Sequence, residues 1–424
     1  MPDVHILTLG CPKNTVTSRR LEKALGRLGA TLIGNPDDAD AVIVNTCGFI
    51  EAAKVESIEC LLDLDKGRRG RPRQKIIAVG CLAERYRVEL TKALPEIDGF
   101  FGFGDLRSLP ALLDLSGELD LDLQSHDGSP SAYLEISDGC GHNCTFCAIP
   151  GIRGPYRSRN EPGLLAEAKY LAEQGCRELV LIGQDTGAYG RDLANASDLP
   201  SLINNLSLTE GIEWLRLLYL QPQHVTDELI ETIANNNKVC PYLDMPVQHA
   251  STKVISAMNR WGDGAAYLKI FERLRRRVPD IALRTSVIVG FPGENKTDLR
   301  TLAEFLTAAE LDYVGIFEFS AEDGTPAAGM NGQISAPVKA ERANQIKALA
   351  DDISARRRER FVGRELDVLI DSQDSGVVIG HTRYQAPEID GDTYVTGITG
   401  AVGDFVRAKI ESQDDYELKG RAVR

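Results

Sequence analysis

The chain has 424 residues, a formal charge of −14 at pH 7, 43% hydrophobic residues and nine cysteines. This length suffices for two to four domains that each bury a core. No apolar run approaches the ~20 residues of a membrane helix, and the first residues lack the basic and apolar parts of a signal peptide, so we expect a cytoplasmic protein without membrane contact. In that reducing compartment, cysteines favour metal or redox chemistry over disulfides. An acidic chain also binds phosphate backbones poorly, so any contact with nucleic acid would be local.

The first hundred residues alternate short β-branched runs with helical periodicity. Such runs predict three buried parallel strands, at residues 4–9, 41–46 and 75–79. Helical stretches between them predict an open parallel α/β domain over residues 2–118. The polar stretch 116–130, rich in Asp, Ser and Gly, predicts a linker.

From residue 133 the alternation of strand and helix restarts on a longer scale. Six strands are predicted, at residues 133–137, 178–183, 214–220, 242–246, 282–290 and 314–320. Strict alternation implies right-handed crossovers and a parallel sheet. Six units fall short of the eight that close a barrel, so we expect an incomplete (β/α)6 TIM-like barrel over residues 126–358, open at one side.

The last part of the chain changes character after a long helical stretch at residues 339–361. Short alternating segments are separated by Gly and Asp turns, at residues 366–371, 376–382, 392–395 and 404–410. They predict a small antiparallel β-barrel over residues 361–424.

Cys140, Cys144 and Cys147 lie on one short loop after the first predicted barrel strand, where active sites of this architecture form. Each iron of a cubane cluster needs one thiolate, so three cysteines can hold three irons and leave the fourth open to a substrate. A zinc site would need a fourth ligand, and His142 sits in a cramped place between the first two cysteines. The third alternative, three unconnected structural cysteines, is the weakest at this spacing.

Three further cysteines, Cys11, Cys47 and Cys81, each follow one of the three N-terminal strands. Ligands of an open parallel sheet bind at the carboxyl ends of its strands, so these thiols should converge. Scattered buried cysteines are the alternative, but chance would also scatter their position relative to the strands. This second trio again leaves one iron of a cluster open.

The CxxxCxxC spacing, with an aromatic residue before the last cysteine, resembles the cluster loop of radical S-adenosylmethionine enzymes. The resemblance implies that the open iron chelates S-adenosylmethionine, and that one electron from the cluster cleaves it to methionine and a deoxyadenosyl radical. It makes Cys140, Cys144 and Cys147 the catalytic centre. Residues 181–186 and 286–294 resemble family segments that meet the cofactor, which implies cofactor contacts by Gln184, Gly290 and Glu294. A turn at a strand end is the equal alternative for these three.

A radical domain preceded by a second cysteine trio resembles the methylthiotransferases over essentially the whole chain. The matching segments are residues 9–14, 45–49, 153–154 and 246–251 and a C-terminal TRAM-like barrel. The resemblance implies two 4Fe–4S clusters, the second of which is the sulfur site. It also implies S-adenosylmethionine as both methyl donor and radical source, and a reduced flavodoxin or ferredoxin-type electron donor.

Two branches of this family differ in substrate: a tRNA base beside the anticodon, or an aspartate of protein twelve of the small ribosomal subunit. Residues 361–424 carry seven Lys+Arg and twelve Asp+Glu, a net charge of −5. A negative barrel grips RNA poorly but suits a basic ribosomal protein. Residues 137–138, 248–250 and 383–391 also resemble the ribosomal-protein branch. We therefore predict methylthiolation of the aspartate β-carbon in that protein, free or within a ribosomal particle.

Two other functions compete with this prediction. A tRNA adenosine methylthiotransferase would use identical machinery, and the basic stretch 66–75 could contact RNA, although its Gly and Pro residues favour a solvated connection. A non-catalytic iron–sulfur or RNA-binding assembly protein is a different class. An electron carrier needs fully ligated irons, whereas each group here offers three cysteines.

Overall fold

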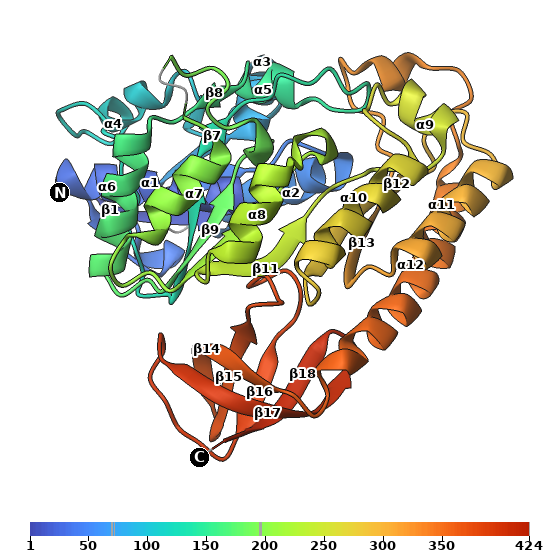
Figure 1. Ribbon diagram of the computed structural model, residues 1–424. Helices are drawn as coiled ribbons and strands as arrows, with labels where there is room; N and C mark the ends of the chain where they lie inside the picture. The colour runs from blue at the N-terminus through green and yellow to red at the C-terminus, as the bar shows by residue number, and fades with distance from the viewer. Residues whose placement is uncertain (69–70, 72, 195–196, 424) are drawn as a thin grey trace.

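The computed structural model describes residues 1–68, 71, 73–194 and 197–423. An N-terminal α/β unit packs beside a central barrel, and the long helix α12 (Ala336–Arg358) leads from that barrel to a small C-terminal barrel (Figure 1). None of the helices in these residues is long and apolar enough to cross a membrane. The predicted fold class is confirmed.

The N-terminal unit is a parallel sheet in the order β2-β1-β3-β4-β5. Its strands are β1 (Asp3–Thr8), β2 (Thr31–Leu32), β3 (Ala41–Thr46), β4 (Lys75–Gly80) and β5 (Gly99–Phe101). Its helices are α1 (Pro12–Arg27), α2 (Glu51–Gly67), α3 (Cys81–Ala93) and the short α4 (Leu109–Leu112). The three predicted strands are present. The sequence missed β2 and β5 because strands of two or three residues show no periodicity.

The central unit is a six-stranded parallel sheet in the order β13-β12-β11-β10-β9-β6, open between its two edges. Its strands are β6 (Ser131–Glu135), β9 (Glu178–Ile182), β10 (Trp214–Leu217), β11 (Val239–Asp244), β12 (Ala282–Val289) and β13 (Tyr313–Glu318). Its other helices include α6 (Glu161–Glu173), α7 (Leu199–Ser207), α8 (Asp227–Asn235), α9 (Thr252–Ala257), α10 (Gly264–Arg277) and α11 (Lys296–Ala309). The incomplete barrel is therefore as predicted.

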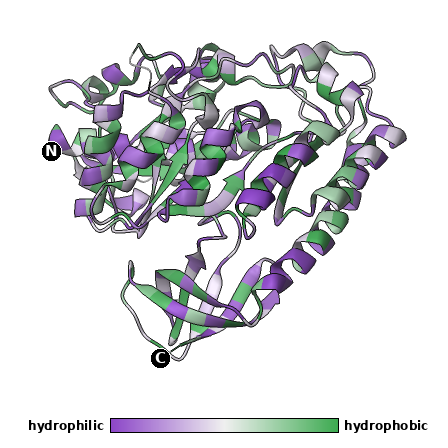
Figure 2. Cartoon of the chain, viewed as in Figure 1, coloured by the Kyte–Doolittle hydropathy of each residue, from purple (hydrophilic) through white to green (hydrophobic). Residues whose placement is uncertain are grey.

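The two faces of the central sheet are covered differently. The outer face packs against its helices in the largest hydrophobic core, and Figure 2 shows hydrophobic residues concentrated on these strands. The inner face carries Val180, Trp214 and Tyr242, which cluster with Val16 of α1 and Leu369 of the C-terminal barrel. Side chains of the N-terminal and C-terminal units thus pack against the inner face of the sheet and bury part of it.

The C-terminal unit is a closed barrel in the order β14-β15-β16-β18-β17. Its strands are β14 (Glu365–Asp374), β15 (Val377–Thr382), β16 (Thr393–Thr396), β17 (Phe405–Asp414) and β18 (Glu417–Ala422). Two details differ from the expectation. The pairing of β16 with β18 is parallel in an otherwise antiparallel barrel. The sequence missed β18, because its charged outer positions have low strand propensity and only alternate residues face inward.

A buried charge network attaches the C-terminal barrel to the central one. His381 of β15 pairs with Glu178 of β9, whose other oxygen accepts a 2.6 Å bond from Arg216. Burial disfavours the charged forms of both Glu178 and His381. The positive charges of Arg216 and His381 outweigh this effect at Glu178 and lower its pKa to about 2. Likewise, Glu178 and Asp371 raise the pKa of His381 to about 9. The ordinary pKa of histidine is 6.5, so His381 is protonated at neutral pH when the C-terminal barrel is attached to the central one.

We expect this attachment to weaken between pH 6.5 and 9, as His381 loses its proton. The pKa of His381 in the folded protein lies above its ordinary value. The stabilisation that its charge contributes is therefore complete below pH 6.5 and is lost as the pH rises through 9. The shift corresponds to about 3 kcal/mol at most. Trp214, with its ring centroid 5.8 Å from that of His381, reports on the interface.

Urea unfolding followed by Trp214 fluorescence, in a Trp261→Phe background, measures this pH dependence. The variant His381→Asn should lose most of the change between pH 6.5 and 9. Equal pH dependence in the two proteins would contradict the assignment.

Candidate metal centres and active site

The three N-terminal cysteines converge at the carboxyl edge of their sheet. Cys11 precedes α1, Cys47 follows β3, and Cys81 begins α3. Gly10 has φ +97°, and a Cβ on it would lie 2.7 Å from Cys47 Cβ. Only glycine permits this approach of two strand ends, so the turn brings the thiols together.

Asn14 holds the three strand ends in register with one another. Its Nδ2 donates to the carbonyl oxygens of Leu9 and Thr46, at 2.8 and 3.2 Å, and its Oδ1 lies 3.8 Å from Cys81 Sγ. The side chain is fully buried. The sequence placed Asn14 in a motif without a role, since nothing local shows that one amide reaches three strands.

The second group, Cys140, Cys144 and Cys147, lies between the short strand β7 (Ser137–Asp138) and the helix α5 (Ile149–Arg153). Main-chain bonds tie the loop to the barrel: Cys140 N–H donates to Gly154 O at 3.2 Å, and Thr145 N–H donates to a carbonyl after α9 at 3.1 Å. The three predicted cysteines therefore sit at the mouth of the barrel, where an open iron would face the strand ends.

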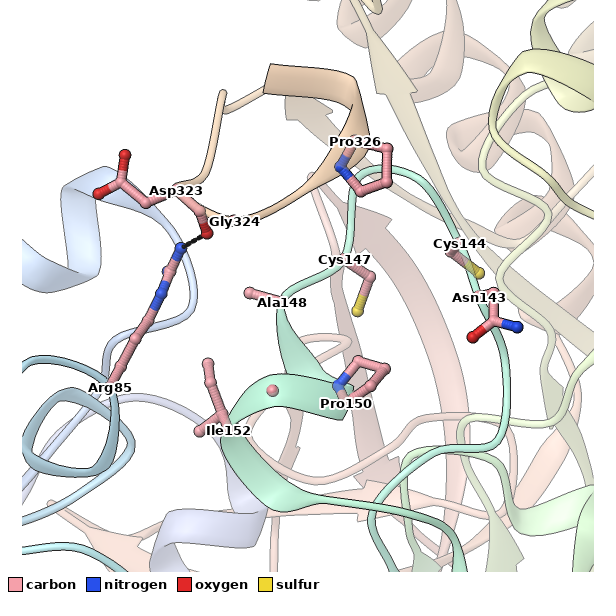
Figure 3. Close-up of a pocket in the computed structure, with 11 residues that line it drawn as sticks. Arg85, Asn143, Cys144, Cys147, Ala148, Pro150, Ile152, Asp323, Gly324 and Pro326 are labelled. Carbon is pink, nitrogen blue, oxygen red and sulfur yellow. Dashed lines mark hydrogen bonds between the residues drawn. The ribbon is translucent and has the colours of Figure 1, made fainter. Parts of the chain in front are cut away.

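A cavity of about 390 Å³ borders Cys144 and Cys147. Figure 3 shows Cys147 pointing into it from the loop, with Arg85 of α3 and Pro326 on other walls. Arg85 donates to Asp323 O at 2.7 Å and so links the N-terminal unit to the barrel at one wall of the cavity. Space at the thiols fits a bound group larger than a single ion.

The spacing of the thiols distinguishes a site for an iron–sulfur cluster from a site for a zinc ion. Zinc–thiolate bonds of about 2.3 Å put the sulfur atoms of a tetrahedral site roughly 3.8 Å apart. In the described part of the chain, neither cysteine trio forms a group of ligand atoms within 4.8 Å of one another. Yet Cys47 feels the charges of Cys81 and Cys11, so the thiols are neighbours. This wider grouping fits a cluster with one thiolate per iron.

Burial raises the pKa of Cys47 to about 11 and that of Cys147 to about 12. The thiolates therefore need a positive partner, which iron supplies when it displaces the protons. Burial also lowers the pKa of Lys13, although the nearby Cys11 opposes that change.

Arg153 connects the two trios. It ends α5, directly after the second cysteine loop, and its Nη2 lies 3.2 Å from Asn14 Oδ1 and 4.0 Å from Cys81 Sγ. The guanidinium pairs with Asp138 at 3.3 Å and stacks 4.3 Å from the centroid of the Phe103 ring. A side chain of the radical domain thus reaches the N-terminal thiols, which places the two trios on a shared junction.

The three predicted cofactor contacts lie at strand ends of the barrel but differ in their surroundings. Gln184 follows β9, and both polar atoms of its side chain are buried without a protein partner. Glu294 is 4% exposed and already accepts bonds from Gly290 N–H, at 2.9 Å, and from Arg342, at 2.7 Å. Gln184 is therefore open to a ligand, whereas Glu294 shapes the backbone at Gly290.

Further buried polar atoms without protein partners surround the same mouth. They belong to Ser137, Gln221 and His249, which follow β6, β10 and β11. His249 Nδ1 accepts the N–H groups of Ala250 and Ser251, so its Nε2 carries the proton, which forms no hydrogen bond although Glu294 Oε2 lies 3.5 Å away. Unpaired buried donors and acceptors are costly, and a polar cofactor such as S-adenosylmethionine would satisfy them. The residues present therefore fit it.

His142 has a different role from a cluster ligand. Its Nε2 lies 2.7 Å from Asp185 Oδ2, and His224 Nε2 lies 3.1 Å from the same oxygen. Burial opposes ionisation of Asp185, but the two histidine hydrogen bonds outweigh it and lower its pKa to about 2. The carboxylate thus anchors the cysteine loop to the ends of β9 and β10. Sequence reasoning missed this group, because its members are far apart in the chain.

Three family models match the chain in tandem. That of uncharacterized protein family UPF0004 matches residues 3–102, that of the radical SAM superfamily matches residues 134–306, and that of the TRAM domain matches residues 362–423. Among solved structures, the radical S-adenosylmethionine methyltransferase TsrM from Kitasatospora setae, with a tryptophan substrate and an analogue of S-adenosylmethionine bound, has a TM-score of 0.58. It is 13% identical, and the match covers 83% of this chain and 89% of TsrM. That likeness concerns the fold.

Curated relatives match over nearly the whole chain. The ribosomal protein uS12 methylthiotransferase RimO of Moorella thermoacetica is 43% identical, covering 96% of both chains. Its counterparts from Geobacter sulfurreducens and Alkaliphilus oremlandii are 42% and 40% identical, each covering 99% of this chain and 98% of the relative. The chain therefore belongs to the RimO family of radical S-adenosylmethionine methylthiotransferases.

Proposed function

We propose that this enzyme transfers a methylthio group to the β-carbon of an aspartate in ribosomal protein uS12. As a radical S-adenosylmethionine methylthiotransferase, it uses S-adenosylmethionine and 4Fe–4S clusters. The observation that carries the proposal is the junction of two cysteine trios through Arg153, which sits beside Cys81 and directly after the Cys140–Cys147 loop. One trio suits a radical source and the other a sulfur site.

The roles of the cysteines follow from their places. We assign Cys140, Cys144 and Cys147 to the cluster that binds S-adenosylmethionine, because they lie at the barrel mouth among the unpaired polar groups. We assign Cys11, Cys47 and Cys81 to the cluster that supplies sulfur. When bound, the two clusters and S-adenosylmethionine supply the deoxyadenosyl radical, the methyl group and the sulfur.

The protein's own groups hold these components. Gln184 offers an amide to the polar end of S-adenosylmethionine, since both its polar atoms lack protein partners. Glu294 fixes the turn at Gly290, φ +75°, which forms another edge of the cofactor site. Asp185 keeps the cysteine loop in place through His142. The β-carbon of an aspartate carries a strong, non-acidic C–H bond, so hydrogen-atom removal is the chemistry this reaction requires.

The charge of the C-terminal barrel supports a protein substrate over tRNA. Residues 361–424 have a net charge of −5, and Arg407 and Lys419 pair with acids of the same barrel. Phosphate binding would need free cations there. In the basic stretch 66–75, Lys66 and Arg68 pair with Asp63 and with Asp65, while residues 69, 70 and 72 lie outside the described part. The electron donor is proposed to be a reduced flavodoxin or ferredoxin-type protein, and the substrate to be free uS12 or uS12 within a ribosomal particle.

Deletion of the gene should remove one methylthio group from uS12 and leave tRNA unchanged. Mass spectrometry of ribosomal proteins and of digested tRNA from the deletion strain measures both substrates at once. Complementation with the intact gene is the control. Loss of a methylthio mass from tRNA alone would overturn the proposed substrate in favour of the tRNA branch.

A further inference from the structure

Lys13 reaches from the N-terminal unit to the mouth of the central barrel. It lies in the first turn of α1, two residues after Cys11. Its Nζ is 3.6 Å from the centroid of the Tyr219 ring, and Tyr219 follows β10. The ammonium group therefore sits where the sulfur-side trio meets the carboxyl ends of the barrel strands.

Lys13 has no counter-ion in the part of the chain that the structure describes: no ion pair within 4.0 Å involves it. The neighbouring cations are paired, as Arg153 is with Asp138 and Arg284 is with Asp244. The second oxygen of Asp244 accepts the N–H of Tyr219 at 3.0 Å, so this carboxylate is already engaged. An aromatic face alone stabilises a half-buried ammonium weakly, and its three donors remain available to an anion.

The main chain at Tyr219 holds the ring of this residue against Lys13. Its φ of +59° is an uncommon conformation for a residue with a side chain, and the Asp244 bond to its N–H maintains it. Such local strain persists when the surrounding structure over-determines it, and it is concentrated at ligand-binding and catalytic positions. This turn brings the ring to Lys13, and the ring also packs against the cluster on the inner face of the sheet.

We propose that Lys13 binds the side-chain carboxylate of the substrate aspartate. The inference rests on the proposed function and deepens it, because it names the group that selects aspartate. The carbon that reacts is bonded directly to that carboxylate carbon. A carboxylate held at Lys13, between the Cys11 side and the barrel mouth, leaves the β-carbon within reach of both. Lys13 is then a specificity-determining residue.

A double-mutant cycle tests this pairing with the loaded enzyme before reductant is added, so that binding is measured without turnover. The binding partners are uS12 and a uS12 variant with Asn at the target aspartate. With the wild-type enzyme, the Asp→Asn change should weaken binding by about 100-fold, since removal of one partner of a desolvated charge pair costs several kcal/mol. With Lys13→Met, both forms of uS12 should bind equally weakly, and Lys13→Arg should retain part of the preference.

The matched control is Lys23→Met. Lys23 lies on the same helix, and its Nζ is also 3.6 Å from a tyrosine centroid, that of Tyr170. This variant should keep the full preference for Asp over Asn. Iron content shows that each variant still loads both clusters.

The outcomes distinguish the carboxylate of the substrate aspartate from the carboxylate of S-adenosylmethionine. If the Asp→Asn change costs the same with Lys13→Met as with the wild type, or nothing with either, the proposal is wrong. If Lys13→Met instead weakens binding of S-adenosylmethionine alone in equilibrium dialysis, Lys13 serves the cofactor carboxylate and the proposal is equally overturned. Failure of the proposed function looks different: the wild-type enzyme would then leave the mass of uS12 unchanged after turnover.

Discussion

Replacing Cys140, Cys144 and Cys147 by Ala should leave about four of about eight irons and abolish the formation of deoxyadenosine. We assign each of these thiols to one iron, so their loss should remove one complete 4Fe–4S cluster and the site proposed to cleave S-adenosylmethionine. The other trio stands on separate strand ends held by Asn14, so its cluster should still assemble. Iron analysis after anaerobic reconstitution and chromatographic detection of deoxyadenosine measure the two effects.

The reciprocal variant distinguishes the roles of the trios. With Ala at Cys11, Cys47 and Cys81, deoxyadenosine should still form, whereas uS12 should gain no methylthio group. The control is Cys60→Ala, because Cys60 lies on α2 outside both trios and should be dispensable. Cleavage of S-adenosylmethionine by the Cys140, Cys144 and Cys147 variant would show that the roles are assigned wrongly.

Replacing Arg153 by Met should lower the iron content at the N-terminal trio and destabilise the contact between the two units. The guanidinium is 3% exposed, and it lies against Asp138, Asn14 and Cys81 at once. Its removal leaves the partly exposed carboxylate of Asp138 and the sulfur of Cys81 without their cation. The buried partner is Glu135, whose Oε1 lies 3.6 Å from the guanidinium, and loss of this cation should cost about 1–3 kcal/mol.

Urea unfolding and iron analysis of the Arg153→Met enzyme check this prediction. Arg157→Met is the matched control, because Arg157 is exposed on the short strand β8 (Arg157–Ser158) and lies four residues farther along the same segment. It should match the wild type in both measurements. A Met variant at position 153 with wild-type iron content and stability would mean that the bridge between the trios is incidental.

Much of the architecture was accessible from local patterns. The runs at residues 41–46 and 75–79 became β3 and β4 almost residue for residue, because fully buried parallel strands need continuous apolar stretches. The position of Cys47 and Cys81 directly after those strands predicted their convergence, since parallel strands share one carboxyl edge. The net charge of the last 64 residues likewise needed only counting.

Other features depend on pairs of residues that are distant in the chain. His142 meets Asp185 across 43 residues, and Arg153 meets Asn14 across 139 residues. These residues lie in segments that resemble the family, but an arginine or an aspartate does not by itself show which distant residue it contacts. The docking of the C-terminal barrel through His381 and Glu178 is hidden for the same reason.

The order of the three units, the parallel strands and the two cysteine trios thus followed from local properties of the chain, namely periodicity and the position of a residue after a strand. The side chains that join these units became visible in the folded protein: Arg153 between the trios, Lys13 over Tyr219 and His381 beneath the barrel. Those contacts arise when separate sheets pack together and their charged groups lose water, and the free energy of such pairing depends on burial and distance rather than on sequence order.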